Sequence, residues 1–216
     1  MNRKYAVLAL LTPVLSASAF GQISKTAEGY VLKAKYFKGQ VIRFVTDNGI
    51  DSSNAEMSAT SLKMPVILEV LRVVKGVATV RVTLGDAFMG GTKVHAAESA
   101  TFPLDNHNRG SSGGTNVGLP LPLKPVKVGA RWSAVMPVNT GGRMTAMKGA
   151  YQFAGMKVFN GHQVGVITYS VSGPASGTGT MMILASDGTM YRNETRLSVT
   201  GQATIRIRST MTRVSK

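Results

Sequence analysis

Short runs of alternating apolar and polar residues, separated by glycine-containing turns, make up most of the chain from Tyr30 onward. In residues 77–84, for example, positions 78, 80, 82 and 84 are apolar, whereas positions 79, 81 and 83 are polar. A period of two places alternate side chains on opposite faces of a strand, so one face of this segment must be buried. No segment keeps the 3.6-residue helical period over three turns. The pattern predicts an all-β protein built from antiparallel strands.

Four Xaa-Gly dipeptides predict the turns between these strands, and Asn160-Gly161 is the strongest two-residue hairpin signal in the chain. Gly173-Pro174 ends one strand, because proline cannot donate a hydrogen bond to a neighbouring strand. The predicted strand pairs are Tyr30–Phe37 with Gln40–Thr46, Met64–Val74 with Val77–Leu84, Tyr151–Phe159 with Gln163–Ser172, and Thr178–Ser186 with Thr189–Thr200, followed by a last strand over Ala203–Arg213.

This order of strands predicts a long-stranded antiparallel meander that forms a curved sheet, a half-barrel or a sandwich. The hairpins that begin at Tyr30 and Tyr151 share an aromatic start and a Phe-Xaa-Gly turn. Two related halves, residues 28–102 and 130–216, are therefore one interpretation of the domain. Residues 103–129 between them combine a Gly/Ser run with a proline-rich stretch. Such a composition is typical of a long loop that acts as a functional flap or as a boundary between subdomains.

The first 21 residues have the three parts of a secretory signal: a basic head, an apolar run over residues 5–15 and a small-residue exit. The apolar run is too short to span a bilayer as an anchor. Cleavage fits after Ala19 or after Gly21, and we prefer the second site. We therefore expect an N-terminal signal helix in a cleavable peptide over residues 1–21, a single all-β domain over 22–216, and export to the periplasm or the extracellular space.

Composition adds two constraints. Cysteine is absent, which excludes disulfides, thiolate metal sites and cysteine nucleophiles. The formal net charge of +15 becomes +13 when Arg3 and Lys4 leave with the signal. A charge of this size favours contact with anionic lipid headgroups or acidic polysaccharide, although a need for solubility also explains it. The cations are spread along the chain, so no basic nucleic-acid-binding tail is expected.

Residues 123–132 read Leu-Lys-Pro-Val-Lys-Val-Gly-Ala-Arg-Trp. Together with Pro122 they resemble the P-x-x-P-V-x-V-G-D-x-W segment of an uncharacterised family of secreted bacterial β proteins, the DUF6263 type, except that Ala130 stands where that segment has Asp. The family also begins, after its signal, with a hairpin similar to residues 30–40. The resemblance implies an exported antiparallel β protein and no assigned activity. The long-stranded plan is also similar to that of lipoprotein carriers of the LolA kind, half-barrels that hold acyl chains on a curved sheet; this is a similarity of architecture alone.

Catalytic and cofactor motifs are scarce. The ten carboxylates show no spacing typical of a metal or acid/base site, and no nucleophile elbow, phosphate-binding loop or dinucleotide fingerprint occurs. We expect no enzyme activity, no cofactor and no metal. The one alternative is a hydrolase that uses Asp105 and His107, whose side chains can converge from an Asp-x-His tripeptide; a solvated loop is the competing interpretation.

Binding is the better-supported class. Twelve methionines provide adaptable apolar surface that either fills the core or lines a ligand cavity. The only tryptophan, Trp132, is interpreted as a core anchor or as a stacking surface. Arg206, Arg208 and Arg213 are predicted to form an outward row with Lys216, a row without the interleaved aromatic residues that base stacking requires. The candidate ligand-binding residues are Trp132, Met181, Met182, Arg206 and Arg208.

The leading hypothesis is an exported non-enzymatic protein that binds an apolar or amphiphilic anionic ligand, such as a lipid, on a concave sheet face. Basic residues at the rim would hold the headgroup, and residues 103–129 would form a flap. The alternative is a structural or adhesive envelope protein that binds acidic polymer through its positive charge. Peripheral membrane contact is compatible with both, and neither involves nucleic acid. The oligomeric state cannot be read from the sequence.

Overall fold

The computed structural model describes residues 23–52, 60–89, 92–110, 119–140, 143–200 and 204–214. These residues form strands and no helix, which confirms the predicted all-β class. None of them forms a helix able to cross a membrane. The predicted signal peptide, residues 1–21, lies outside the described residues. The strands are β1 (Ser24–Thr26), β2 (Gly29–Val31), β3 (Val41–Ser52), β4 (Thr60–Val74), β5 (Val77–Leu84), β6 (Ala87–Met89), β7 (Thr92–His95), β8 (Glu98–Leu104), β9 (Arg131–Thr140), β10 (Arg143–Phe159), β11 (His162–Ser172), β12 (Ser176–Leu184), β13 (Met190–Thr200) and β14 (Thr204–Val214).

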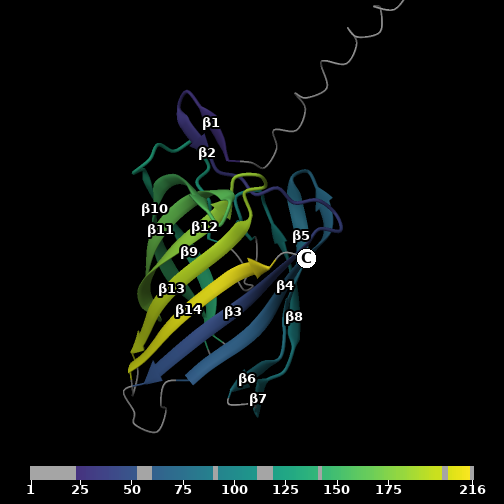
Figure 1. Ribbon diagram of the computed structural model, residues 1–216, viewed down its shortest axis with the longest axis vertical. Helices are drawn as coiled ribbons and strands as arrows, with labels where there is room; N and C mark the ends of the chain where they lie inside the picture. The colour runs from purple at the N-terminus through teal and green to yellow at the C-terminus, as the bar shows by residue number, and fades with distance from the viewer. Residues whose placement is uncertain are drawn as a thin grey trace, which may run out of the picture.

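Strands β3 and β14 pair at the centre of one large antiparallel sheet, although they lie far apart in the sequence. On one side of this pair the sheet continues through β4 and β5 to β8. On the other side it continues through β13, β12, β11 and β10 to β9. The sheet is curved (Figure 1). Within the described chain β8 and β9 each pair with a single neighbouring strand, so the sheet remains open.

The two short hairpins mark the ends of the sheet. Figure 1 shows β1 and β2 at the upper end and β6 and β7 at the lower end. The β4–β5 and β10–β11 turns belong to the upper end, and their Lys75-Gly76 and Asn160-Gly161 dipeptides have the positive φ angles that tight hairpin turns require. The predicted hairpins at these two turns, and the β12–β13 hairpin at Asp187-Gly188, are confirmed.

The chain must pass from β8 at one edge of the sheet to β9 at the other edge, and it does so over residues 105–130. The passage crosses the face that we call inner, on which the hydrophobic core lies. Of its described residues, Leu121 (0% exposed) and Val126 (8%) are packed there, whereas Leu123 (62%) and Val128 (59%) face solvent. The packed parts belong to the core. The predicted flap over residues 103–129 is wrong for these parts, and residues 111–118 lie outside the described chain.

Backbone hydrogen bonds hold the passage in place. Leu121 N donates to His107 O at 2.8 Å, and Tyr30 and Val126 exchange two bonds, of 2.8 and 2.9 Å. The Trp132 indole Nε1 donates to Pro120 O at 2.9 Å, which ties the passage to the first residues of β9. The predicted role of this tryptophan as a core anchor agrees with this contact and with its stacking on the Tyr151 ring.

The predicted hairpin of Tyr30–Phe37 with Gln40–Thr46 is wrong. Residues 32–36 are extended, and Leu32 (1% exposed) and Ala34 (2%) face the core as the alternation predicts. Their backbone partners are loops instead of a strand, because Ala34 N donates to Asn106 O and Lys35 N to Asp187 O, both at 2.7 Å. Strand β3 pairs with β4 and β14.

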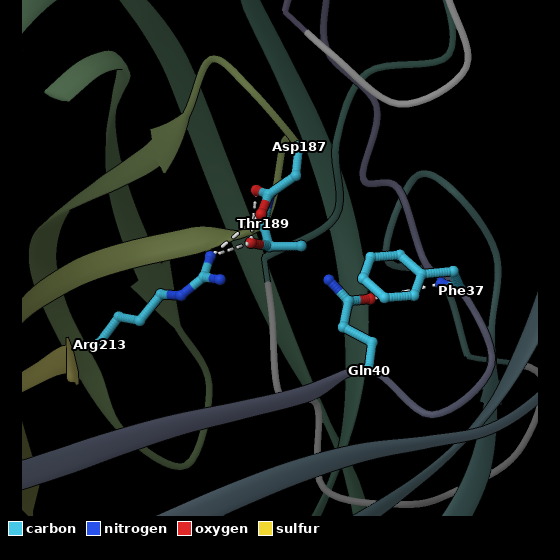
Figure 2. A network of polar contacts seen from close by, with 5 residues as sticks. All are labelled: Phe37, Gln40, Asp187, Thr189 and Arg213. Atoms are coloured by element: carbon cyan, nitrogen blue, oxygen red, sulfur yellow. Dashed lines mark hydrogen bonds and ion pairs between the residues drawn. The ribbon is translucent and has the colours of Figure 1, made fainter. Parts of the chain in front are cut away.

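A polar cluster closes the upper end of the inner face (Figure 2). The Arg213 side chain extends from β14 toward the β12–β13 turn, where its Nη1 lies 3.1 Å from Asp187 Oδ2 and 2.9 Å from Thr189 Oγ1. Thr189 in turn donates from its backbone N and its hydroxyl to Asp187 Oδ1, at 2.9 and 2.6 Å. Arg213 is thus inward, and its predicted place in an outward row with Arg206 and Arg208 is wrong, since it has the opposite parity along β14.

We expect Arg213→Met to lower the free energy of unfolding by about 2 kcal/mol, because it leaves the half-buried Asp187 carboxylate without its cation. The matched control is Arg208→Met, which removes an exposed charge that makes no ion pair with the described chain. Urea unfolding at neutral pH measures both, and equal losses in the two variants would contradict the prediction.

Candidate functional site

The inner face is divided into an upper half that is buried and a lower half that is only partly covered. On β3, Ile42, Phe44 and Thr46 are at most 4% exposed, whereas Asn48 and Ile50, farther along the same face, are half-buried. Strand β4 shows the same change along its length, from fully buried residues in its upper part to half-buried residues in its lower part. The described parts of the passage make their bonds at the upper half, which explains the gradient.

A single cross-strand row of aromatic and polar residues lies at the boundary between the two halves. In this row Tyr151 stacks on Trp132 with ring centroids 5.7 Å apart, and Tyr169 stands opposite Gly179. The tyrosine ring occupies the space where a Cβ of Gly179 would be, so glycine is required at that position. In order across the sheet, the row consists of Trp132, Tyr151, Tyr169, Gly179, Thr195, Ser209, Asn48 and Leu62.

The two tyrosine hydroxyls of this row are neutral. The Tyr169 hydroxyl lies 2.9 Å from Asn193 Oδ1 and 2.6 Å from Thr195 Oγ1. Burial raises the pKa of Tyr169, an effect that these two hydrogen bonds partly oppose. Burial, and then the nearby Tyr169, raise the pKa of Tyr151 to about 12. Neither phenol ionises near neutral pH, so the row provides hydrogen bonds and no charge.

Two polar groups of the row retain hydrogen-bonding capacity toward the lower half. Asn48 Nδ2 donates to Thr46 Oγ1 at 3.3 Å and to Leu62 O at 3.4 Å, which leaves its amide oxygen without a partner in the described chain. The Ser209 hydroxyl likewise makes no side-chain hydrogen bond with a described residue. Because neither group is fully buried, a molecule on the lower half can reach both.

The lower half itself is apolar. Leu197, Met147 and Ala134 pack with one side against the core and are otherwise partly exposed. Five further apolar residues, from the boundary row or below it, are half-buried and come from four adjacent central strands: Ile50, Leu62, Val199, Ile205 and Ile207. Val171 on β11 faces the same side but is buried, with 6% of its surface exposed. We call the eight partly exposed residues, Leu197, Met147 and Ala134 with these five, the lower inner surface. A concave apolar surface beside a few polar groups is the usual composition of a small-molecule site.

The five predicted ligand-binding residues do not meet at one place. Trp132 lies on the inner face in the boundary row, and Met181 (1% exposed) is core of the upper half. Met182 (5%) points to the other face, which we call outer, where it packs with Val164 and Leu184 in a small separate cluster.

Arg206 and Arg208, the remaining two, are exposed on the outer face of β14. Sequence reasoning included Met147 among the methionines considered as core filler or cavity lining, but it missed the other residues of the lower inner surface, whose signal was the alternation at the ends of the strands. It also missed two outer-face arginines, Arg131 and Arg196.

Asp105 and His107, the alternative hydrolase pair, do not form a dyad. Asp105 Oδ1 accepts hydrogen bonds from the backbone N of His107 and of Arg109, both at 2.8 Å, and so caps its own loop. His107 Nε2 is buried without a hydrogen-bond partner in the described chain. Among the described residues no three His, Asp or Glu side chains cluster in a way that could hold a metal ion.

Comparison with protein-family models and with curated proteins finds no match to the chain.

We expect His107 to make stability depend on pH. Burial lowers the pKa of His107; the nearby Asp105 raises it, and Lys33 and Arg109 lower it further. Because the folded-state pKa lies below the unfolded value, the contribution of neutral His107 to the free energy of unfolding is complete above about pH 6.5. This contribution is lost as the pH falls below that value.

Urea midpoints between pH 7.5 and 5 test this expectation. His107→Asn should flatten the loss of stability across this range. The exposed His162, at the β10–β11 turn, is the control, and His162→Asn should retain the wild-type profile. An unchanged profile in His107→Asn would refute the assignment.

Proposed function

We propose that the protein is a non-enzymatic binder of an elongated amphiphile whose acyl chain lies along the lower inner surface. The observation that carries the proposal is the gradient of burial along the inner face. Eight apolar residues face the concave side there and remain partly exposed in the described chain, whereas residues a few positions away on several of the same strands are buried. Covering such a surface is worth about 25 cal/mol per Å² of apolar area removed from water.

An acyl chain suits this surface better than a compact ligand does. The surface extends over strands from both sides of the β3–β14 seam, and its Met147 side chain adapts to a flexible chain. The boundary row closes it at the upper side, where Ser209 and Asn48 offer hydrogen bonds to an ester or hydroxyl group. At the lower side the headgroup would lie at the rim, near Arg206 at the beginning of β14.

The expected export of the protein and its positive charge agree with a lipid ligand. An exported protein of net charge +13 after signal removal would meet anionic membrane lipids, and peripheral contact with a membrane would provide the ligand.

Trp132 permits a direct test, because it is the only tryptophan and lies in the boundary row. We expect a fatty acid brominated along its chain to quench Trp132 fluorescence saturably, since the next inward residue of β9, Ala134, belongs to the lower inner surface. Ile207→Glu should weaken this binding at least about tenfold, because it places a charge against the acyl chain.

The control is Val45→Glu, which introduces the same charge at an apolar residue that is 40% exposed on the outer face. It should leave binding within about twofold of wild type. Ile207→Gln serves as a neutral variant if the glutamate unfolds the protein, with circular dichroism melting as the check. No quenching in wild type, or equal losses at positions 45 and 207, would refute the proposal.

A further inference from the structure

The outer face of strands β9–β14 carries a groove of about 730 Å³, and its side chains point away from the core. A second hollow of about 460 Å³ continues it toward β3 and shares Arg208 and Thr210 with it. Six strands at a spacing of about 4.8 Å make the first groove about 24 Å long across the strands. That length fits an extended chain better than a single small molecule.

Two adjacent cross-strand rows form the floor of the groove, and hydroxyl and amide groups contribute to both. Besides the charged residues, the first row has Gln152, Thr168, Thr180 and Thr210, and the second has Ser170, Thr178 and the apolar Ala150. The two tyrosines that contribute to the groove have their rings on the inner face. The groove therefore offers many hydrogen bonds and no outward aromatic platform among its described residues.

Three arginines give this polar floor its charge: Arg131 at the β9 edge, Arg196 on β13 and Arg208 on β14. None of them makes an ion pair in the described chain. The groove's one carboxylate, Glu194, is 2.7 Å from Arg192 Nε and is already neutralised by it. The second hollow adds Asp47, which accepts a hydrogen bond from Ser61.

Arg196 and Arg208 are direct cross-strand partners. Like charges in this position destabilise a sheet, because their Cβ atoms lie only about 5 Å apart. The β3 residue opposite Arg208 is Gly49, and a side chain there would meet no atom within 4 Å, so open space adjoins the pair. An anionic group placed between the two guanidinium groups would remove the repulsion and gain charge-assisted hydrogen bonds.

We propose that this groove binds an anionic polysaccharide, with a carboxylate or sulfate held between Arg196 and Arg208 and the sugar hydroxyls bonded to the threonine rows. Sugars fit the lining, because they present hydroxyls at every repeat. Single-stranded nucleic acid fits it less well, because its bases would find no ring on which to stack. The site lies on the opposite face of the sheet from the lower inner surface, so it is independent of the amphiphile proposal.

Calorimetric titration with oligogalacturonate tests the proposal. We expect saturable binding that weakens as salt increases, and no binding of the methyl-esterified oligomer, which has the same sugars without the charge. Arg196→Gln combined with Arg208→Gln should lose at least about tenfold in affinity. The double variant should also melt no lower than wild type in the absence of ligand, because it removes a repulsion.

The matched control combines Arg43→Gln with Lys148→Gln, which removes the same charge from exposed outward positions beyond the groove. The affinity of this control for oligogalacturonate should stay within about twofold of wild type. Arg131→Gln alone should give a loss of affinity between those of the two double variants. If both double variants lost the same affinity for oligogalacturonate, net charge alone would explain the binding, and the proposed site would be wrong. Binding of the methyl ester, tighter binding of a single-stranded oligonucleotide, or no binding of either oligogalacturonate or a sulfated oligosaccharide would also overturn it.

Discussion

One connection determines the interior of this protein: the passage of the chain from β8 to β9, which are opposite edges of the same open sheet. A connection between opposite edges must run over one face, and it buries its own apolar residues by running over the concave one. Leu121 and Val126 fill the upper half in this way, together with Leu32 from the N-terminal segment. The concave face therefore has a solid core, although among the described strands only the short β1–β2 sheet packs against it from outside the large sheet, through Tyr30.

The same passage explains why the two faces offer different chemistry. Its bonds to Tyr30 and Trp132, and the bond within it between Leu121 and His107, concentrate at the upper half, so most inner side chains below the boundary row keep part of their surface exposed. The outer face carries one small apolar cluster around Val164, Met182 and Leu184, and in the groove over β9–β14 it is lined mainly by polar and charged residues. One sheet thus presents an apolar surface on its concave side and an arginine and threonine surface on its other side.

Sequence patterns predicted the strands well and their partners less well. Alternation identified residues 32–36 as extended with Leu32 and Ala34 inward, yet it could not tell that their hydrogen bonds go to loops. Turn dipeptides specified the local hairpins, since their geometry is a property of adjacent residues. The β3–β14 pairing joins Ser52 to Ile205, and no local signal encodes a contact of that separation.

The candidate surfaces were partly within reach of the sequence. The predicted strand bounds, Thr200 and Ala203, would place Arg196 opposite Ile207, whereas the observed pairing of Thr200 with Thr204 shifts the register by one residue and places it opposite Arg208. Arg213 and Ile207 are an even number of residues apart on one strand, so alternation places both side chains on the same, inner face. The flap interpretation of residues 103–129 failed because glycine and proline content describes how a segment bends, and says nothing about which face of a sheet it crosses.

The central seam also has a consequence for how the protein reaches its native state. The hairpins on either side of it close over short loops, whereas β3 and β14 must find each other across most of the polypeptide, at a large entropic cost of loop closure. Each flanking half-sheet can thus assemble early, and the seam joins them late, in the slow step typical of high contact order. Until then both seam strands expose unpaired backbone to other molecules, so this step is the one most vulnerable to aggregation.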